Sequence, residues 1–241
     1  MQSEVLSVDT RNRYPCLRAV IFDMDGVIVD SHPAHRKAWR QFLRTFGREV
    51  SEAELDFILD GRKRADILRH FLGELSEVEI LDYGKRKDDF FRDSFSKVNV
   101  FRGVTELLDE LSSNGIATAV ATSASENRTR STLDRLHLTK RFSVIVTEGD
   151  VIHGKPDPAV YRLACRRLGV ESKHALAIED AASGIQAAKA ANLACVGVAN
   201  RDRSKMLTAA GADHVLENFV GVSVDKLEAV LRRRAMPKKL V

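Results

Sequence analysis

Long apolar runs are absent from this 241-residue sequence, and no stretch approaches the roughly 20 apolar residues that a membrane-spanning helix needs. Cysteine is scarce, and Cys16, Cys165 and Cys195 are odd in number and widely spaced, so a disulfide framework is not indicated. Each lies in or beside an apolar segment, so we expect three buried free thiols. Residues 1–15 are polar and lack the apolar segment of a secretory signal. These absences predict a cytoplasmic protein without a membrane partner.

A strong excess of one charge is also missing, although the net charge is +4. Residues 226–241 hold six basic residues and one acid, a net charge of +5, so the rest of the chain is close to neutral. A short basic segment of this kind is usually a solvated, fraying helix end. We therefore expect no nucleic-acid partner, and we assign residues 1–16 and 226–241 to terminal extensions.

Short apolar segments alternate with helical patterns along most of the chain. The segments expected to be strands cover residues 17–22, 117–121, 143–146, 175–178 and 194–198. The helical patterns between them cover residues 104–113, 127–137, 159–168 and 185–191. Near-continuous apolar strands joined by helices indicate a parallel sheet with both faces covered. The sequence therefore predicts a doubly wound, Rossmann-like α/β core formed by residues 17–30 and 101–225.

Residues 31–100 interrupt this alternation and contain no strand-like run. An apolar stripe with helical spacing opens the segment, formed by His35, Trp39, Phe42, Leu43 and Phe46. Further aromatic and aliphatic pairs continue the helical spacing toward residue 95. About 70 residues of helix inserted after the first strand predict a separate, all-helical cap domain.

Polar residues follow the expected strands where each strand ends. Because open α/β sheets bind ligands beyond the carboxyl ends of their strands, these residues should face one crevice. They are Asp23, Asp25, Thr122, Ser123, Lys155, Glu179 and Asp180. Two carboxylates about 4 Å apart repel by roughly 4 kcal/mol at an effective dielectric near 20, so a phosphate could join them only with cations present. Mg²⁺ suits such oxygen ligands, and Lys155 would add a fixed positive charge.

Asp23 and Asp25 point the same way because they are two residues apart in extended chain, whereas Met24 points away from the crevice. Gly26 permits a sharp turn after them. With its charge balanced, Asp23 can act as a covalent nucleophile, and Asp25 can protonate the leaving oxygen and later deprotonate water. Each residue alone is also compatible with a helix cap or a solvated surface position. The calcium-loop alternative fails because an EF-hand needs its glycine at the sixth loop position, between two helices.

The segment of residues 22–30, which contains Asp23, Asp25 and Gly26, resembles the first motif of the haloacid dehalogenase superfamily, in its phosphatase and phosphomutase branch. Residues 121–123, 154–158 and 178–180 resemble the next three motifs. The resemblance implies that Asp23 is the nucleophile and Asp25 the general acid/base. It also implies roles for further residues: Mg²⁺ held by Asp23, Asp180 and the Asp25 carbonyl, with Glu179 as a ligand or its support, and phosphate bound by Ser123 and Lys155.

The cap resembles that of the β-phosphoglucomutase subgroup. The resemblance implies substrate contacts from His35, Trp39, Arg64, Lys87, Ser125 and Asn127, with Arg64 on a second, non-transferring phosphate. Two purely structural interpretations stay open, namely that His35 is a packed core histidine and that Lys87 lies on a solvated face. Ala181 stands where relatives commonly have serine, so a hydrogen bond near the metal site is missing or has moved to Ser183.

These patterns predict a magnesium-dependent phosphohydrolase that acts on a small sugar phosphate through an aspartyl-phosphate. A β-phosphoglucomutase, which interconverts β-glucose 1-phosphate and glucose 6-phosphate by the same chemistry, is the alternative, and Arg64, His35 and Lys87 favour it. A non-catalytic module that binds phosphate or metal is a more remote alternative. We expect the protein to be a monomer whose partner is a small phosphorylated metabolite.

Overall fold

The computed structural model describes residues 16–235, and within them six parallel strands form one sheet in the order β3-β2-β1-β4-β5-β6. The strands are β1 (Ala19–Phe22), β2 (Ala117–Ala121), β3 (Val144–Val146), β4 (Ala175–Glu179), β5 (Ala194–Val198) and β6 (His214–Leu216). This is the strand order of doubly wound folds, so the predicted α/β class is confirmed. The sequence patterns missed β6, which has only three residues, none of them fully buried.

Helices cover both faces of the sheet, because alternate strand residues point to opposite sides. Val20 and Phe22 of β1 belong to one apolar cluster, whereas Ala19 and Ile21 belong to the other. The first cluster is covered by α5 (Val104–Ser113), α6 (Glu126–Arg135) and α10 (Val224–Ala235). The second is covered by α7 (Ala159–Leu168), α8 (Ala182–Ala190) and α9 (Arg201–Ala209). Helix α9 was not predicted from the sequence, and Leu207 is its one buried residue.

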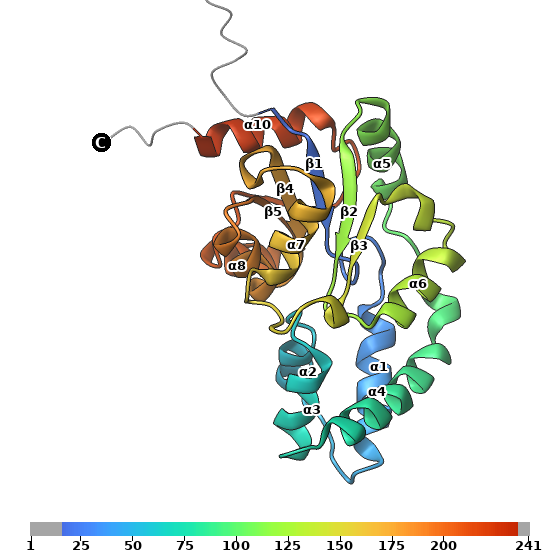
Figure 1. The fold of residues 1–241 in the computed structure, drawn as a ribbon. Helices are drawn as coiled ribbons and strands as arrows, with labels where there is room; N and C mark the ends of the chain where they lie inside the picture. Colours follow the sequence, from blue (N-terminus) through green and yellow to red (C-terminus); the bar gives the residue numbers. More distant parts are fainter. Residues whose placement is uncertain (1–15, 236–241) are drawn as a thin grey trace, which may run out of the picture.

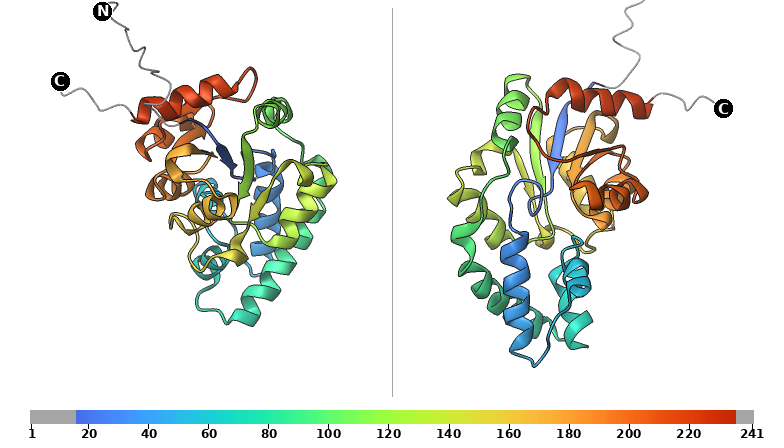
Figure 2. Two further views of the ribbon diagram at one scale, coloured as in Figure 1. Left: turned by 45° about the horizontal axis from the view of Figure 1, so that its top comes forward. Right: turned by 180° about the vertical axis from the view of Figure 1, so that it is seen from behind.

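Four helices follow β1 and lie beyond the carboxyl ends of the strands (Figures 1 and 2). They are α1 (His32–Arg44), α2 (Glu52–Ile58), α3 (Arg64–Leu72) and α4 (Glu77–Arg92). Reciprocal hydrogen bonds between a serine and a glutamate three residues later start two of them, Ser51 with Glu54 in α2 and Ser76 with Glu79 in α4. The four helices share an apolar cluster of their own, which includes Trp39, Phe42 and Leu68. Short 3₁₀ turns complete the structure: η2 (Phe95–Lys97), η3 (Thr139–Arg141), η4 (Glu148–Asp150) and η5 (Ser172–His174).

Two expectations about the ends of the chain need correction. Cys16 is exposed rather than buried, because it precedes β1 and lies outside both clusters, whereas Cys165 and Cys195 are buried free thiols. Residues from 226 onward were placed in a terminal extension, yet Leu227 and Val230 of α10 are buried in the core because the helix has an apolar face. The expected extension 1–16, apart from Cys16, and the basic residues beyond 235 lie outside the described part of the chain. Within residues 16–235, every helix is too short or too polar to cross a bilayer.

Candidate active site

The turn after β1 brings two aspartates to the carboxyl edge of the sheet. The amide of Asp23 still donates to the carbonyl of Ile178 on β4, at 2.9 Å, so the sheet fixes the position of Asp23. Met24 is fully buried in the core, as the alternation predicts. Gly26 follows with φ of +81°, and a Cβ atom there would lie 2.3 Å from Asp180 Oδ2. The close approach of the turn to Asp180 therefore requires glycine.

Lys155 lies beneath this turn and is almost completely buried. Its ammonium group donates to Asp23 Oδ1 at 2.5 Å, to the carbonyl of Ala121 at 3.1 Å and to Glu179 Oε1. Tyr161 donates a further hydrogen bond to Glu179 Oε1, at 2.6 Å. Burial favours the neutral amine, but the charges of Asp23 and Glu179 outweigh it and raise the pKa of Lys155. Lys155 is therefore a fixed cation that holds the Asp23 carboxylate in place.

Three buried carboxylates, Asp23, Glu179 and Asp180, offer oxygen atoms that all lie within 4.8 Å of one another. Burial and the charges of Glu179 and Asp25 raise the pKa of Asp23 to about 7, although Lys155 opposes this shift. Burial and the same crowding of carboxylates raise the pKa of Asp180 well above its usual range. One bonded ammonium group thus leaves the cluster with excess negative charge.

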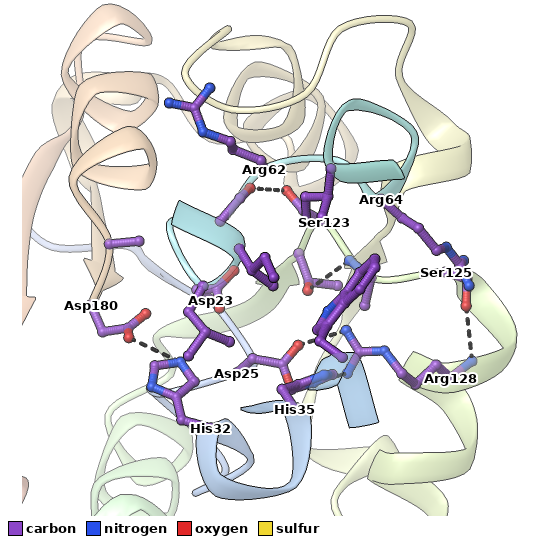
Figure 3. Close-up of a pocket in the computed structure, with 18 of the residues that line it drawn as sticks. Asp23, Asp25, His32, His35, Arg62, Arg64, Ser123, Ser125, Arg128 and Asp180 are labelled. Atoms are coloured by element: carbon purple, nitrogen blue, oxygen red, sulfur yellow. Dashed lines mark hydrogen bonds and ion pairs between the residues drawn. The ribbon is translucent and has the colours of Figure 1, made fainter. Parts of the chain in front are cut away.

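The donor set of this cluster fits a divalent cation. Asp180 Oδ2 is buried and receives no hydrogen bond from residues 16–235, although His32 Nε2 lies 3.3 Å away (Figure 3). Both oxygens of Glu179 are already engaged, Oε1 by Lys155 and Tyr161 and Oε2 by the amide of Asp180 at 3.1 Å. Asp23 and Asp180 are therefore better placed to hold an ion directly, with Glu179 orienting Lys155.

Asp25 points away from this cluster, toward α1 and α6 (Figure 3). Arg128 binds it in a bidentate pair, with Nη2 2.7 Å from Oδ2 and Nη1 3.0 Å from Oδ1. Ser31 Oγ donates to Oδ1 at 2.6 Å, and His35 Nε2 lies 3.2 Å from the same oxygen. Burial alone would raise the pKa of Asp25, but Arg128 and His35 outweigh it and hold this pKa well below its usual value. In this arrangement Asp25 is an ionised carboxylate.

His35 and Lys87 form a buried pair behind Asp25. Lys87 Nζ lies 3.1 Å from His35 Nδ1, and an ammonium group only donates, so we assign the ring proton to Nε2, which faces Asp25. Burial and the neighbouring cations lower the pKa of His35 to about 3, so the ring is neutral. His35 also stacks on Phe91, with ring centroids 4.3 Å apart. It is both a packed core residue and a site residue, and the interpretation of Lys87 as a solvated side chain is wrong, because its relative exposure is 3%.

Arg64 begins α3 and faces the core across the cavity. Its Nη1 lies 2.8 Å from Asp88 Oδ2 on α4, and its Nη2 lies 2.6 Å from Glu148 Oε1 on the core. Both ends of the guanidinium group are therefore neutralised by carboxylates. Arg64 joins the cap to the core, and its charge is already balanced without a ligand.

The loop between α2 and α3 makes further contacts with the core. Ser123 Oγ donates to the carbonyl of Gly61 at 2.6 Å, so the hydroxyl expected to bind phosphate is bonded to the cap. Lys63 Nζ donates to the carbonyl of Val151 at 2.6 Å. The Ser183 hydroxyl donates to the carbonyl of Asp60, and the Ser183 amide lies 3.3 Å from Asp60 Oδ1. Ser183 thus bonds to the cap rather than replacing the missing serine at Ala181.

A cavity of about 80 Å³ lies between cap and core at these residues. Most of the residues singled out from the sequence line it: Asp23, Asp25, His35, Trp39, Arg64, Lys87, Ser123, Ser125, Glu179 and Asp180. Lys155 lies just behind Asp23, and Asn127 lines a neighbouring cavity instead.

Several site residues were missed from the sequence. Arg128 and Asp88 each directly follow a residue that was singled out, Asn127 and Lys87 respectively. Neither Arg128 nor Asp88 belongs to a strand-end motif, so only their position next to these residues could have indicated a role in the site. His32 and Asp60 carried no comparable signal, since their contacts with Asp180 and Ser183 join distant parts of the chain.

Comparison with known proteins gives consistent matches. The family model described as haloacid dehalogenase-like hydrolase matches residues 20–198. A phosphorylated carbohydrates phosphatase of Thermotoga maritima is 34% identical over 180 residues, which cover 73% of this chain and 82% of that protein. A β-phosphoglucomutase of Mycobacterium tuberculosis is 30% identical over 240 residues, with 84% of this chain and 90% of that protein covered. The crystal structure of β-phosphoglucomutase from Clostridium difficile superimposes with a TM-score of 0.81 at 25% identity and covers 91% of this chain and 99% of that chain.

Proposed function

The chain belongs to the haloacid dehalogenase-like hydrolase family, and its matched relatives include a phosphatase and a phosphomutase. From this we propose that it hydrolyses a small sugar phosphate through an aspartyl-phosphate on Asp23. The relative named for phosphorylated carbohydrates supports the class of substrate. Arg64 is paired with Asp88 and Glu148, and this observation favours hydrolysis over a mutase reaction, in which the phosphoryl group moves between two positions of a sugar.

A mutase of this kind must hold the second phosphate of a bisphosphate in the cap, which requires an excess of positive charge there. Where cap and core meet, Arg64, Lys87 and Arg128 face an equal number of carboxylates, Asp25, Asp88 and Glu148. His35 adds no charge because its pKa is lowered to about 3. A dianionic second phosphate would have to displace a carboxylate from at least one of these partly buried ion pairs, which costs free energy. An uncharged alcohol portion requires no such loss.

The chemistry proceeds in two displacements. A carboxylate oxygen of Asp23 attacks phosphorus, the bond from phosphorus to the sugar oxygen breaks, and Asp25 donates a proton to that oxygen. In the second step, Asp25 takes a proton from water as the water oxygen attacks phosphorus, and the bond to Asp23 breaks to give inorganic phosphate. Lys155 opposes protonation of Asp23 before the first step and holds its carboxylate in position. Held by Arg128, Asp25 is ionised, which is the form that accepts a proton in the second step. The first step needs protonated Asp25, so the ion pair with Arg128 must loosen before it.

We propose Mg²⁺ as the bound cation, held by Asp23 and Asp180 with the carbonyl of Asp25. When bound, the ion would offset the negative charge of the phosphate and of the carboxylate cluster. Glu179, fixed by Lys155 and Tyr161, would support the site from behind. We also propose that the protein acts as a cytoplasmic monomer, since a cap and a core from one chain enclose the cavity.

Replacing Asp23 by asparagine tests this function. The variant should release no phosphate above background from sugar phosphates in the presence of Mg²⁺, because the amide cannot form the acyl phosphate. The matched control is Asp82→Asn, an exposed aspartate on α4 that should behave as wild type. Phosphate release that persists in Asp23→Asn would refute the covalent mechanism.

The wild-type protein, incubated with β-glucose 1-phosphate and a trace of the 1,6-bisphosphate, separates the two enzyme classes. Free phosphate is the expected product. Accumulation of glucose 6-phosphate without free phosphate would instead make the protein a mutase. Binding of Mg²⁺ without turnover of any phosphate ester would favour the non-catalytic alternative.

A further inference from the structure

A second cavity adjoins the first one across a shared wall. It has a volume of about 570 Å³, within the range of about 300–1,000 Å³ typical of ligand sites, whereas the cavity at Asp23 has about 80 Å³. Four residues line both cavities: Arg64, Asp88, Ser125 and Arg128. The cavity at Asp23 is therefore much the smaller of the two, and an alcohol portion too large for it would extend toward these four shared residues.

The larger cavity, which we call the outer chamber, lies between α3 and α4 of the cap and α6 of the core. Leu81, Phe91 and Phe95 supply apolar surface, and the start of α6 supplies the polar side chains of Ser125 and Asn127. Apolar surface with a few placed hydrogen-bonding groups is typical of sites for small organic ligands. Asn127, which was expected from the sequence to contact the sugar, lines the outer chamber but not the cavity at Asp23.

Most charged side chains of the chamber wall are already bonded within the protein. Arg64 is bonded to Asp88 and Glu148, and Arg128 is bonded to Asp25 just outside the chamber. Arg92 is paired with Asp89, and Lys63 donates to two backbone carbonyls. Such ion pairs offer both donors and acceptors, which a polyhydroxylated group can use. Lys85, exposed on α4, is a further cation of this wall.

We propose that the outer chamber binds the alcohol portion of the substrate, and that this portion is a polyhydroxylated group larger than a single sugar ring. The proposal rests on the phosphatase function proposed above and specifies the size of its substrate. The phosphoryl group would lie at Asp23, the first ring at the wall formed by Arg64 and Arg128, and the remainder between Leu81 and Asn127.

A series of monophosphates of increasing size tests the proposal with the full-length protein and Mg²⁺. Glycerol 3-phosphate, glucose 6-phosphate and the disaccharide monophosphate trehalose 6-phosphate differ in how far they reach into the chamber. We expect kcat/KM to rise along the series, by at least tenfold between the one-ring and the two-ring compound. Equal or falling values would overturn the proposal.

The variant Leu81→Trp narrows the chamber, and Val78→Trp is its matched control. Both residues are exposed on α4, at 74% and 76%, but only Leu81 lines the chamber. In Leu81→Trp we expect the ratio of kcat/KM for trehalose 6-phosphate to that for glycerol 3-phosphate to fall at least tenfold. In Val78→Trp this ratio should match the wild type. An unchanged ratio in Leu81→Trp would overturn the proposal, and Ser131→Trp, from the opposite wall, provides the same test if the first variant does not fold.

The two proposals fail in different ways. If glycerol 3-phosphate is hydrolysed by the wild type and not by Asp23→Asn, the phosphatase function stands even when no preference for size is found. If no monophosphate of the series is hydrolysed, both the function and the chamber assignment are refuted.

Discussion

Replacing Lys87 by methionine should change how the stability of the protein depends on pH. Lys87 is buried, and burial lowers its pKa from the ordinary value of 10.5 to about 8, with Asp88 opposing the shift and the nearby arginines adding to it. A difference of this size, at 1.36 kcal/mol for each unit of pKa, corresponds to about 3 kcal/mol of stability. Methionine has a similar length and no charge, so it removes the titration while largely preserving the packing.

The direction in which stability changes with pH follows from the protonation of Lys87 in the folded and in the unfolded protein. Below pH 8 the side chain is protonated in both the folded and the unfolded protein, and the folded state carries the full cost of burying the ammonium group. Between pH 8 and 10.5 the folded state loses its proton while the unfolded state keeps it, so the stability of the wild type rises with pH. Above 10.5 both states are neutral and the cost is gone. The stability of Lys87→Met relative to the wild type should therefore fall by about 3 kcal/mol between pH 7 and pH 10.5.

Urea denaturation of both proteins at several pH values between 7 and 10.5 measures this difference, and groups that titrate equally in both proteins cancel. The absolute offset at pH 7 also contains the lost hydrogen bond to His35, about 1 kcal/mol, so the trend with pH carries the test. Lys85→Met, an exposed lysine on the same helix, should show no such trend. If the difference in unfolding free energy between Lys87→Met and the wild type stays constant across this pH range, the lowered pKa of Lys87 is refuted.

Two further predictions concern the core side of the site. In Arg128→Met, Asp25 loses its bidentate partner while burial remains, so the pKa of Asp25 should rise. Because Asp25 is the proton donor in the first step, which kcat/KM reports, the alkaline limb of the pH profile of kcat/KM should move to higher pH. Arg130→Met, an exposed neighbour on α6, is the control, and an unmoved alkaline limb in Arg128→Met would contradict the assignment. In Gly184→Ala, the new Cβ would lie 2.0 Å from Glu179 Oε1, which Lys155 and Tyr161 hold in place, so we expect a loss of about 1–3 kcal/mol and a melting temperature several degrees lower. Gly149→Ala, where a Cβ would meet nothing within 4 Å, should melt like the wild type, and equal melting temperatures for both variants would contradict this packing.

The core of the fold and the position of the two aspartates were predictable because their signals are local. Each central strand is a short apolar run, and the residue that follows it must lie at the carboxyl edge of a parallel sheet. Asp23 and Asp180 therefore reach one crevice from β1 and β4, which pair directly in the sheet. Where the local signal weakens the prediction fails, as for β6, a three-residue edge strand with little burial, and for Cys16, which precedes the first strand.

The sequence by itself determined that Asp23 and Asp25 follow a buried strand and that a helical segment is inserted after them. Tertiary structure alone decided what surrounds them, because the cap folds back onto the core. Arg128 meets Asp25 across 103 positions of the chain, and Arg64 meets Glu148 across 84. No local pattern encodes such pairs. The first depends on how α6 packs beside the turn after β1, and the second on how the cap faces the core. These long-range ion pairs set the charge around the cavity between cap and core.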